Sequence, residues 1–230
     1  MRLKYQIHSF WLAVIGALWL TVAYSQPLLH ALRDYNTSGV TQLLLLCVVA
    51  ILYTLLLLFA RMLRVLLPSV VLLFTIAAVV RYYMLQYQVI VDPSMVVNLL
   101  ETDSREALDV ITRGSVLKVL LWGVFPALLL VVFARRESSA WTTRALQFSA
   151  ASVLAVVLLT GAFYSHYGDF ASLFRNHRDI KYRIIPFNAV SSLVSVLKRT
   201  LAQPEQLIVI GTDASRSVDD ERLQVLVLVV

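Results

Sequence analysis

QLLLLCVVAILYTLLLLFA, residues 42–60, contains no charged side chain and is followed by Arg61 and Arg64. An α-helix needs about twenty predominantly apolar residues to cross the hydrocarbon core of a bilayer. The stretch has that length, and the two arginines that follow it would lie at the level of the lipid head groups. It therefore predicts a membrane-spanning helix.

The composition of the whole chain is that of a polytopic membrane protein. Of its 230 residues, 59% are hydrophobic and 15% are charged, and the mean hydropathy is +0.77. We expect the first apolar run to be a retained anchor, because no convincing signal-peptidase site follows it. The sequence thus predicts an all-α polytopic domain over residues 1–164 with five transmembrane helices, the four others being residues 10–24, 65–83, 116–134 and 145–164.

The basic residues of the short loops set the expected orientation. Loops rich in Arg and Lys stay on the cytoplasmic side. We therefore expect a multi-pass membrane protein with its amino terminus in the cytoplasm and its carboxyl terminus on the opposite side, which for a bacterial inner membrane is the periplasm. The formal charge of +6 is explained by these loop residues. It does not indicate binding to nucleic acid, for which the sequence has no motif. The residues expected on the cytoplasmic side are Arg2, Lys4, Arg61, Arg64, Arg135, Arg136 and Arg144.

One polar, helix-like segment lies between the third and fourth runs, VDPSMVVNLLETDSREALDVITRG, residues 91–114. Asp92 suits the N-cap of a helix, and Pro93 suits its first position, where no N–H is needed. Gly114 suits the position just after the last residue. The segment predicts one amphipathic periplasmic helix over residues 92–113.

Three polar side chains would form a stripe along this helix. At 100° per residue, Asn98, Thr102 and Glu106 fall on one face. An amide, a hydroxyl and a carboxylate in a row could bind a zwitterionic or cationic head group. They could also be the solvated face of a surface helix, which is the commoner case for such a stripe. The spacing leaves both interpretations open.

The chain after the fifth run is less hydrophobic. We expect residues 165–222 to be a periplasmic linker that lies on the membrane, irregular at first and then an amphipathic helix from about Asn188. The final residues 223–230, LQVLVLVV, have the composition of a buried parallel strand. We expect them to be the first strand of an α/β domain that this sequence does not contain. Basic residues expected to face lipid are Arg175, Arg178, Lys181, Arg183, Lys198 and Arg199.

Metal binding and transport find no support in the residue pattern. The histidines, His8, His30, His166 and His177, lack the spacing of a metal site, and Cys47 is the only cysteine. Ionisable residues are nearly absent from the middle of the predicted spans, whereas channels and transporters usually carry them there.

Four segments resemble the membrane-bound phosphoethanolamine–lipid A transferases of Gram-negative bacteria, and with the five spans they cover practically the whole chain. They are YYMLQYQVIVDPSMVVNLLETDSREA (82–107), GDFASLFRNHR (168–178) with IIPFN (184–188), VIGTDASR (209–216) and LVLVV (226–230). In that family an Asn-x3-Thr-x3-Glu helix is part of the cavity for phosphatidylethanolamine. The resemblance therefore implies that Asn98, Thr102 and Glu106 bind the donor lipid. Phe170 departs from the family's usual tyrosine.

The resemblance also implies the chemistry and its location. The family uses zinc and a threonine nucleophile, in an alkaline-phosphatase-like domain, to move phosphoethanolamine from phosphatidylethanolamine to a lipid A phosphate, which gives polymyxin resistance. A Gly-Glu-Thr motif normally follows the first strand, here residues 226–230. We expect this chain to hold no catalytic residue and no metal ligand, and to be inactive alone.

A non-enzymatic inner-membrane scaffold or sensor remains the alternative function. The sequence leaves open the acceptor phosphate or sugar, the residues that touch lipid A, and the oligomeric state.

Overall fold

The computed structural model describes residues 6–103, 110–135 and 137–201. Glu106 and the predicted strand 223–230 lie outside these residues. Within them the secondary structure is helical, apart from one parallel bridge between Ile7 and Ala134. The elements are α1 (Ser9–Tyr24), α2 (Gln26–Asp34), α3 (Gly39–Met62), α4 (Leu66–Tyr87), α5 (Pro93–Glu101), α7 (Arg113–Val119), η1 (Leu120–Val124), α8 (Phe125–Phe133), α9 (Trp141–Ser165), α10 (Tyr167–Asn176), η2 (Arg178–Arg183) and α11 (Phe187–Leu201).

The predicted spans are present as long apolar helices. Four helices have the length and composition to cross a membrane: α3, α4, α9 and the continuous α7–η1–α8 (Arg113–Phe133). The pair α1–α2, bent by 48°, qualifies as a fifth. The outward face of α9 is apolar and exposed, as at Val153, Val156 and Val157. Such a face suits contact with lipid chains.

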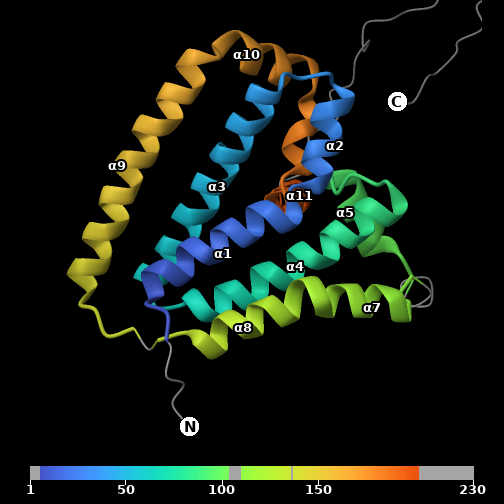
Figure 1. Cartoon of the computed structure of the whole chain (residues 1–230). Helices are drawn as coiled ribbons and strands as arrows, with labels where there is room; N and C mark the ends of the chain where they lie inside the picture. Colours follow the sequence, from blue (N-terminus) through green and yellow to red (C-terminus); the bar gives the residue numbers. More distant parts are fainter. Residues whose placement is uncertain (1–5, 104–109, 136, 202–230) are drawn as a thin grey trace, which may run out of the picture.

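The spanning helices converge at one end and spread toward the other. The beginnings of α1, α4 and α9 and the ends of α3 and α8 meet at the convergent end (Figure 1). Helix α1 packs against α3 and α4 along the centre. Leu20 of α1, Leu57 of α3 and Phe74 of α4 are fully buried in the resulting core.

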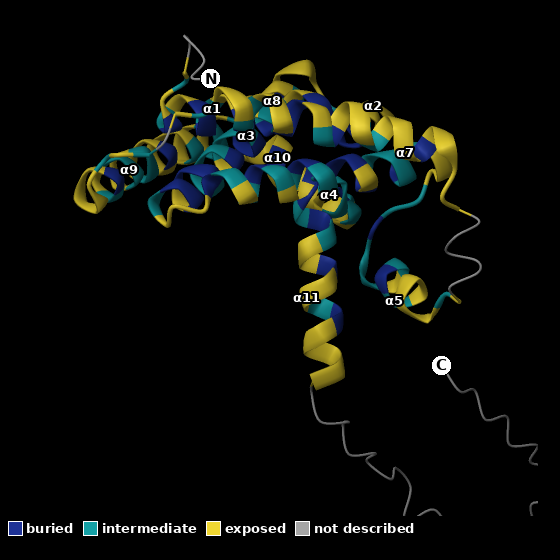
Figure 2. Ribbon diagram, turned by 90° about the horizontal axis from the view of Figure 1, so that it is seen from below, coloured by how far each residue is buried: buried dark blue, intermediate teal, exposed yellow. Residues whose placement is uncertain are grey.

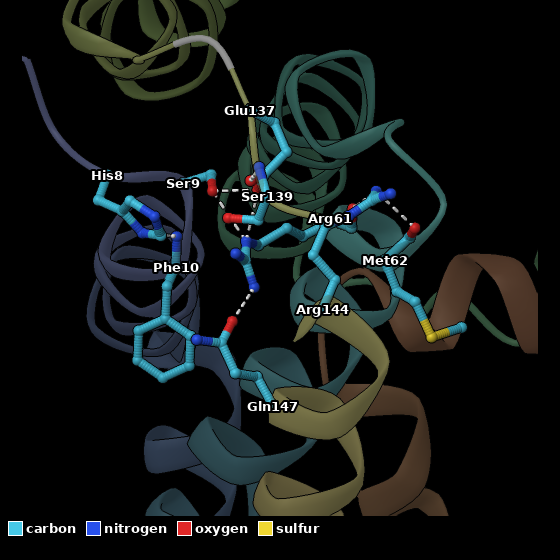
Figure 3. A network of polar contacts seen from close by, with 9 residues as sticks. All are labelled: His8, Ser9, Phe10, Arg61, Met62, Glu137, Ser139, Arg144 and Gln147. Carbon is cyan, nitrogen blue, oxygen red and sulfur yellow. Dashed lines mark hydrogen bonds and ion pairs between the residues drawn. The ribbon is translucent and has the colours of Figure 1, made fainter. Parts of the chain in front are cut away.

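A polar cluster closes the convergent end, and we call Ser9, Arg61, Glu137, Arg144 and Gln147 the Arg61 cluster (Figure 3). Arg61 Nε lies 2.8 Å from Glu137 Oε2 and 2.8 Å from Ser9 Oγ, and its Nη1 donates to Gln147 Oε1 at 2.6 Å. Ser9 also donates to Glu137. Arg144 Nη1 donates to the carbonyl oxygen of Arg61 at 3.1 Å. The cluster thus joins α1, α3, α9 and the segment before α9.

Two arginines counted from the sequence as charges of the cytoplasmic loops are buried in the protein. The structure places Arg61, Arg64, Arg135 and Arg144 at the convergent end, as the orientation argument expects. Only 1% of Arg61 and 3% of Arg144 is exposed. Their role is therefore to hold helices together, and Glu137 supplies the opposite charge that a buried guanidinium requires.

The fourth span contains a π-helical turn, η1, just before Pro126. Pro126 has no N–H, so the carbonyl group of Trp122 loses its usual helical donor. Tyr24 Oη donates to that carbonyl oxygen at 2.7 Å. Gly123 permits close contact with α4, since a Cβ there would lie 2.9 Å from the carbonyl oxygen of Phe74.

The single helix predicted for residues 92–113 is wrong. Helix α5 ends at Glu101, and the backbone of Thr102 is extended, with φ −66° and ψ 130°. A new helix, α7, begins after Thr112, whose side chain forms a reciprocal capping box with Ser115. Gly114 therefore lies in the first turn of α7 instead of after a helix. The capping box at Thr112 and Ser115 thus starts a separate helix within the range over which one continuous helix was predicted.

The segment predicted to be irregular after the fifth span is largely helical. It forms α10 and the 3₁₀ helix η2. Phe170 and Leu173 of α10 are buried in the core. This packing stabilises a helix that the local sequence pattern does not predict. The predicted amphipathic helix is present as α11 and begins at Phe187.

Glu137→Gln should destabilise the fold. Burial raises the pKa of Glu137, but hydrogen bonds from Ser9 and Ser139 and the charge of Arg61 outweigh burial and lower this pKa to about 2 from 4.5. The variant should lose about 3 kcal/mol of unfolding free energy at pH 7, at about 1.4 kcal/mol per pKa unit. Unfolding in detergent measures this, with exposed Glu101→Gln as control.

The pH dependence has a defined sign. Because the folded state has the lower pKa, the contribution of Glu137 is complete above pH 4.5 and is lost as the pH falls toward 2. The difference in stability between the wild type and Glu137→Gln should therefore shrink over this range. Equal stability of the two proteins at pH 7 would contradict the proposed role of the Arg61 cluster.

Candidate lipid-binding site

Helix α5 begins as the sequence predicts. Gln88, in the left-handed region with φ 55°, ends α4 and turns the chain toward α5. Asp92 is the N-cap of α5, and its Oδ1 accepts a hydrogen bond from the backbone N–H of Met95 at 2.8 Å. Pro93 occupies the first helical position, so the expected start of this helix is confirmed.

The structure brings two of the three stripe residues together. Asn98 is exposed on α5, and Thr102 follows the last residue of the helix and is half-buried. Thr102 Oγ1 donates to the carbonyl oxygen of Asn98 at 2.6 Å. The hydroxyl can still accept a hydrogen bond, and the Asn98 amide is open to a ligand. Glu106 lies outside the described residues, so its place in the stripe stays a prediction.

The apolar side of α5 is only partly covered by the chain. Val96 is buried, with 9% of its surface exposed. Leu99 and Leu100, near the end of the same helix, are 56% and 67% exposed. The end of α5 therefore presents apolar side chains next to the polar Asn98 and Thr102, which is an arrangement suited to a membrane interface.

Helix α11 holds α5 in place. It projects from the layer of spanning helices, and α5 lies on the same side of that layer (Figure 2). Ser192 Oγ of α11 donates to the carbonyl oxygen of Val91, just before α5, at 3.1 Å. Val91, Val96 and Val196 are all buried in the core cluster. Helix α11 was expected only to lie on the membrane, and the structure shows that it also supports α5 and the candidate site.

Asn188 connects α11 to the spanning helices. It is fully buried, and its Nδ2 donates to the carbonyl oxygen of Tyr182 at 2.9 Å and lies 3.4 Å from Met84 Sδ of α4. The sequence argument missed this role, although Asn188, Ser192 and Val196 recur every four residues. That spacing marks one face of α11, and all three are buried.

A polar junction fixes the segment that precedes α11. Tyr35 Oη donates to Asp179 Oδ2 at 2.5 Å, and Arg183 Nε lies 3.1 Å from the same oxygen. His177 stacks on the Tyr35 ring with centroids 3.6 Å apart. Burial raises the pKa of Asp179, but the hydrogen bonds from Tyr35 and Arg183 outweigh it, so this pKa lies below its ordinary value. Arg183, expected to face lipid, is therefore engaged within the protein.

The described residues offer no place for the zinc ion that the family resemblance implies. Within residues 6–103, 110–135 and 137–201, no three His, Cys, Asp or Glu side chains lie close enough to hold a metal ion.

Comparisons with known proteins agree with this architecture. The solved structure of the integral membrane protein lipooligosaccharide phosphoethanolamine transferase A (EptA) from Neisseria meningitidis superimposes with a TM-score of 0.77 at 22% identity. The superposition covers 85% of this chain and 37% of that one. The two proteins thus share the fold of the membrane region.

Curated relatives match by sequence. Phosphatidylethanolamine transferase Mcr-1 of Escherichia coli is 30% identical over 153 residues, which are 65% of this chain and 28% of that protein. Phosphatidylethanolamine transferase Mcr-2 of Escherichia coli is 27% identical over 221 residues, 92% of this chain and 40% of that protein. The chain thus spans well under half the length of these relatives. A family model described as phosphoethanolamine transferase EptA/EptB matches residues 45–201. The chain belongs to this family.

Proposed function

We propose that this chain is the membrane-anchoring, donor-lipid-binding part of an enzyme that transfers phosphoethanolamine from phosphatidylethanolamine to lipid A. The observation that carries the proposal is α5, which presents Asn98 and Thr102 beside exposed Leu99 and Leu100 within the region matched by the family model. The names of Mcr-1 and Mcr-2 support phosphatidylethanolamine as the donor. The name of the Neisseria meningitidis protein supports a lipid-linked saccharide as the acceptor.

The side chains of α5 suit the two parts of a phospholipid. Leu99 and Leu100 would lie among acyl chains near the interface, where exposed apolar surface is removed from water. The Asn98 amide would donate to an ester or phosphate oxygen. Glu106 would bind the ethanolamine ammonium through a charge-assisted hydrogen bond, which discriminates ethanolamine from neutral head groups.

The proposed placement in the cell follows the loop charges. Arg64 and Arg135 are exposed at the convergent end of the helices, which would be cytoplasmic by the positive-inside rule. The spread end, with α5 and α11, would then face the periplasm across the bacterial inner membrane. A donor lipid bound there would come from the outer leaflet.

Phosphoryl transfer itself needs an activated nucleophile and stabilisation of the developing charge. We propose that a zinc-dependent domain outside the described residues supplies both, and that the described part alone transfers nothing. Phosphoethanolamine on lipid A would offset phosphate charge and so weaken the binding of cationic peptides such as polymyxins. The relatives named above are all transferases, which favours this function over a scaffold or sensor.

Glu106→Gln and Asn98→Ala should weaken binding of phosphatidylethanolamine. A charge-assisted hydrogen bond is worth roughly 1.5–3 kcal/mol, so Glu106→Gln should raise the dissociation constant about tenfold or more. The measurement is lipid binding to the 230-residue chain in nanodiscs with increasing phosphatidylethanolamine. Glu101→Gln, which removes an exposed carboxylate at the end of α5, is the matched control and should bind normally. Unchanged binding in both test variants would show that the stripe is solvated surface.

Ser192→Ala should impair the site without touching the head group. The substitution leaves the buried carbonyl oxygen of Val91 without its donor, at a cost of about 1–3 kcal/mol. Hydrogen exchange of residues 91–101 should rise, and lipid affinity should fall severalfold. Ser191→Ala is the matched control, since the Ser191 hydroxyl is exposed and bonds only within α11. Equal exchange in the two variants would contradict support of α5 by α11.

A further inference from the structure

A pocket of about 330 Å³ lies between the start of α2, the last turns of α4 and the α7–η1 helix. It contains none of the stripe residues Asn98 and Thr102. The polar and aromatic side chains that line it are Gln26, Arg81, Tyr82, Gln86, Lys118 and Trp122. The proposed binding of a donor lipid on α5 involves none of these residues.

The pocket carries two positive charges and no carboxylate lines it. Arg81 Nη2 donates to Gln26 Oε1 at 2.7 Å, while Arg81 Nε is buried without a hydrogen-bond partner in the described structure. The ion pairs among the described residues involve neither Arg81 nor Lys118. The positive charge of the pocket is therefore not balanced by a described acidic side chain.

An unpaired positive charge on Arg81 costs free energy, because this residue lies within a membrane span. Arg81 lies within the apolar span α4, six residues before its end, which is roughly 9 Å along the axis. Ionisable side chains in membrane spans are rare and usually serve a ligand or a partner. The ring of Trp122 lies 4.8 Å from the Arg81 guanidinium, and the ring of Tyr82 lies 5.1 Å from Lys118 Nζ. These rings stabilise the cations without neutralising them.

The depth of the pocket and the surface around it suit a lipid. Trp and Tyr side chains gather at the level of the head groups, and Tyr82 and Trp122 both line the pocket. Leu117 and Leu121, next to Lys118 and Trp122 in the sequence, are 66% and 57% exposed. An acyl chain could lie along them while its head group enters the pocket.

Phosphate is the anionic group that these side chains fit. A guanidinium offers a planar pair of donors, and an ammonium offers a point charge, and both bind phosphate oxygens. Gln26 and Gln86 add amide groups to the lining. We propose that the pocket formed by Arg81, Lys118, Gln26 and Trp122 binds the phosphate group of a membrane lipid. This site is separate from the donor stripe and does not depend on it.

Native mass spectrometry of the 230-residue chain with added lipids tests the proposal. The probes are dioleoyl phosphatidylethanolamine, phosphatidylglycerol, phosphatidic acid and, without phosphate, dioleoylglycerol. Arg81→Gln and Lys118→Gln should each weaken binding of the phosphate lipids about tenfold and leave dioleoylglycerol unchanged. Lys118→Arg should retain binding. Arg113→Gln, on the same helix but outside the pocket, is the matched control.

The probes also identify the source of the phosphate. Equal affinity for the two phosphodiester lipids would indicate recognition of any phospholipid, and preference for phosphatidic acid would indicate a phosphomonoester. Lys118 is exposed and makes no described hydrogen bond, so Lys118→Gln remains informative even where Arg81→Gln fails to fold. Unchanged affinity of folded Lys118→Gln for every phosphate lipid would overturn the proposal. So would a loss of dioleoylglycerol binding as large as that of the phosphate lipids.

Discussion

The ion pair between the buried Arg61 and the partly buried Glu137 is the contact on which the arrangement of the spans depends. A guanidinium removed from water needs an opposite charge and several acceptors, and here they come from separate segments of the chain. The requirement fixes the start of α1, the end of α3 and the start of α9 at one point. Since the helices are joined there, their other ends can spread apart. This spread end of the molecule, the divergent end, is where α5, α11 and the Arg81 pocket lie.

The divergent end combines rigid support with exposed binding groups. Asn188 and Ser192 make their hydrogen bonds inside the protein: Asn188 ties α11 to Tyr182 and α4, and Ser192 holds the start of α5 against α11. Asn98 of α5 keeps its side chain at the surface. The division follows a general physical requirement, since a site that binds a mobile lipid must be held by groups that the lipid does not compete for.

Sequence reasoning succeeded where one local property decides the structure. The length of the apolar runs correctly predicted the spans, and Asp92 with Pro93 correctly predicted the start of α5. It failed where distant contacts or competing local bonds decide. The start of α7 depends on the capping box of Thr112 and Ser115, and α10 depends on burial of Phe170. Charge counting treated Arg61 as a head-group residue, because pairing with a residue 76 positions away is invisible in a linear pattern.

Labelling with a phosphatidylethanolamine that carries a photoreactive group on its head group tests most directly whether this chain presents a donor lipid on α5. The 230-residue chain in native inner-membrane vesicles is irradiated, and the labelled peptides are identified by mass spectrometry. The account predicts label concentrated in residues 92–113 and competed by unlabelled phosphatidylethanolamine. The account is contradicted if residues 92–113 are not labelled and the label lies on the exposed apolar face of α9 instead. That pattern is the one expected of a diacylglycerol probe without a head group.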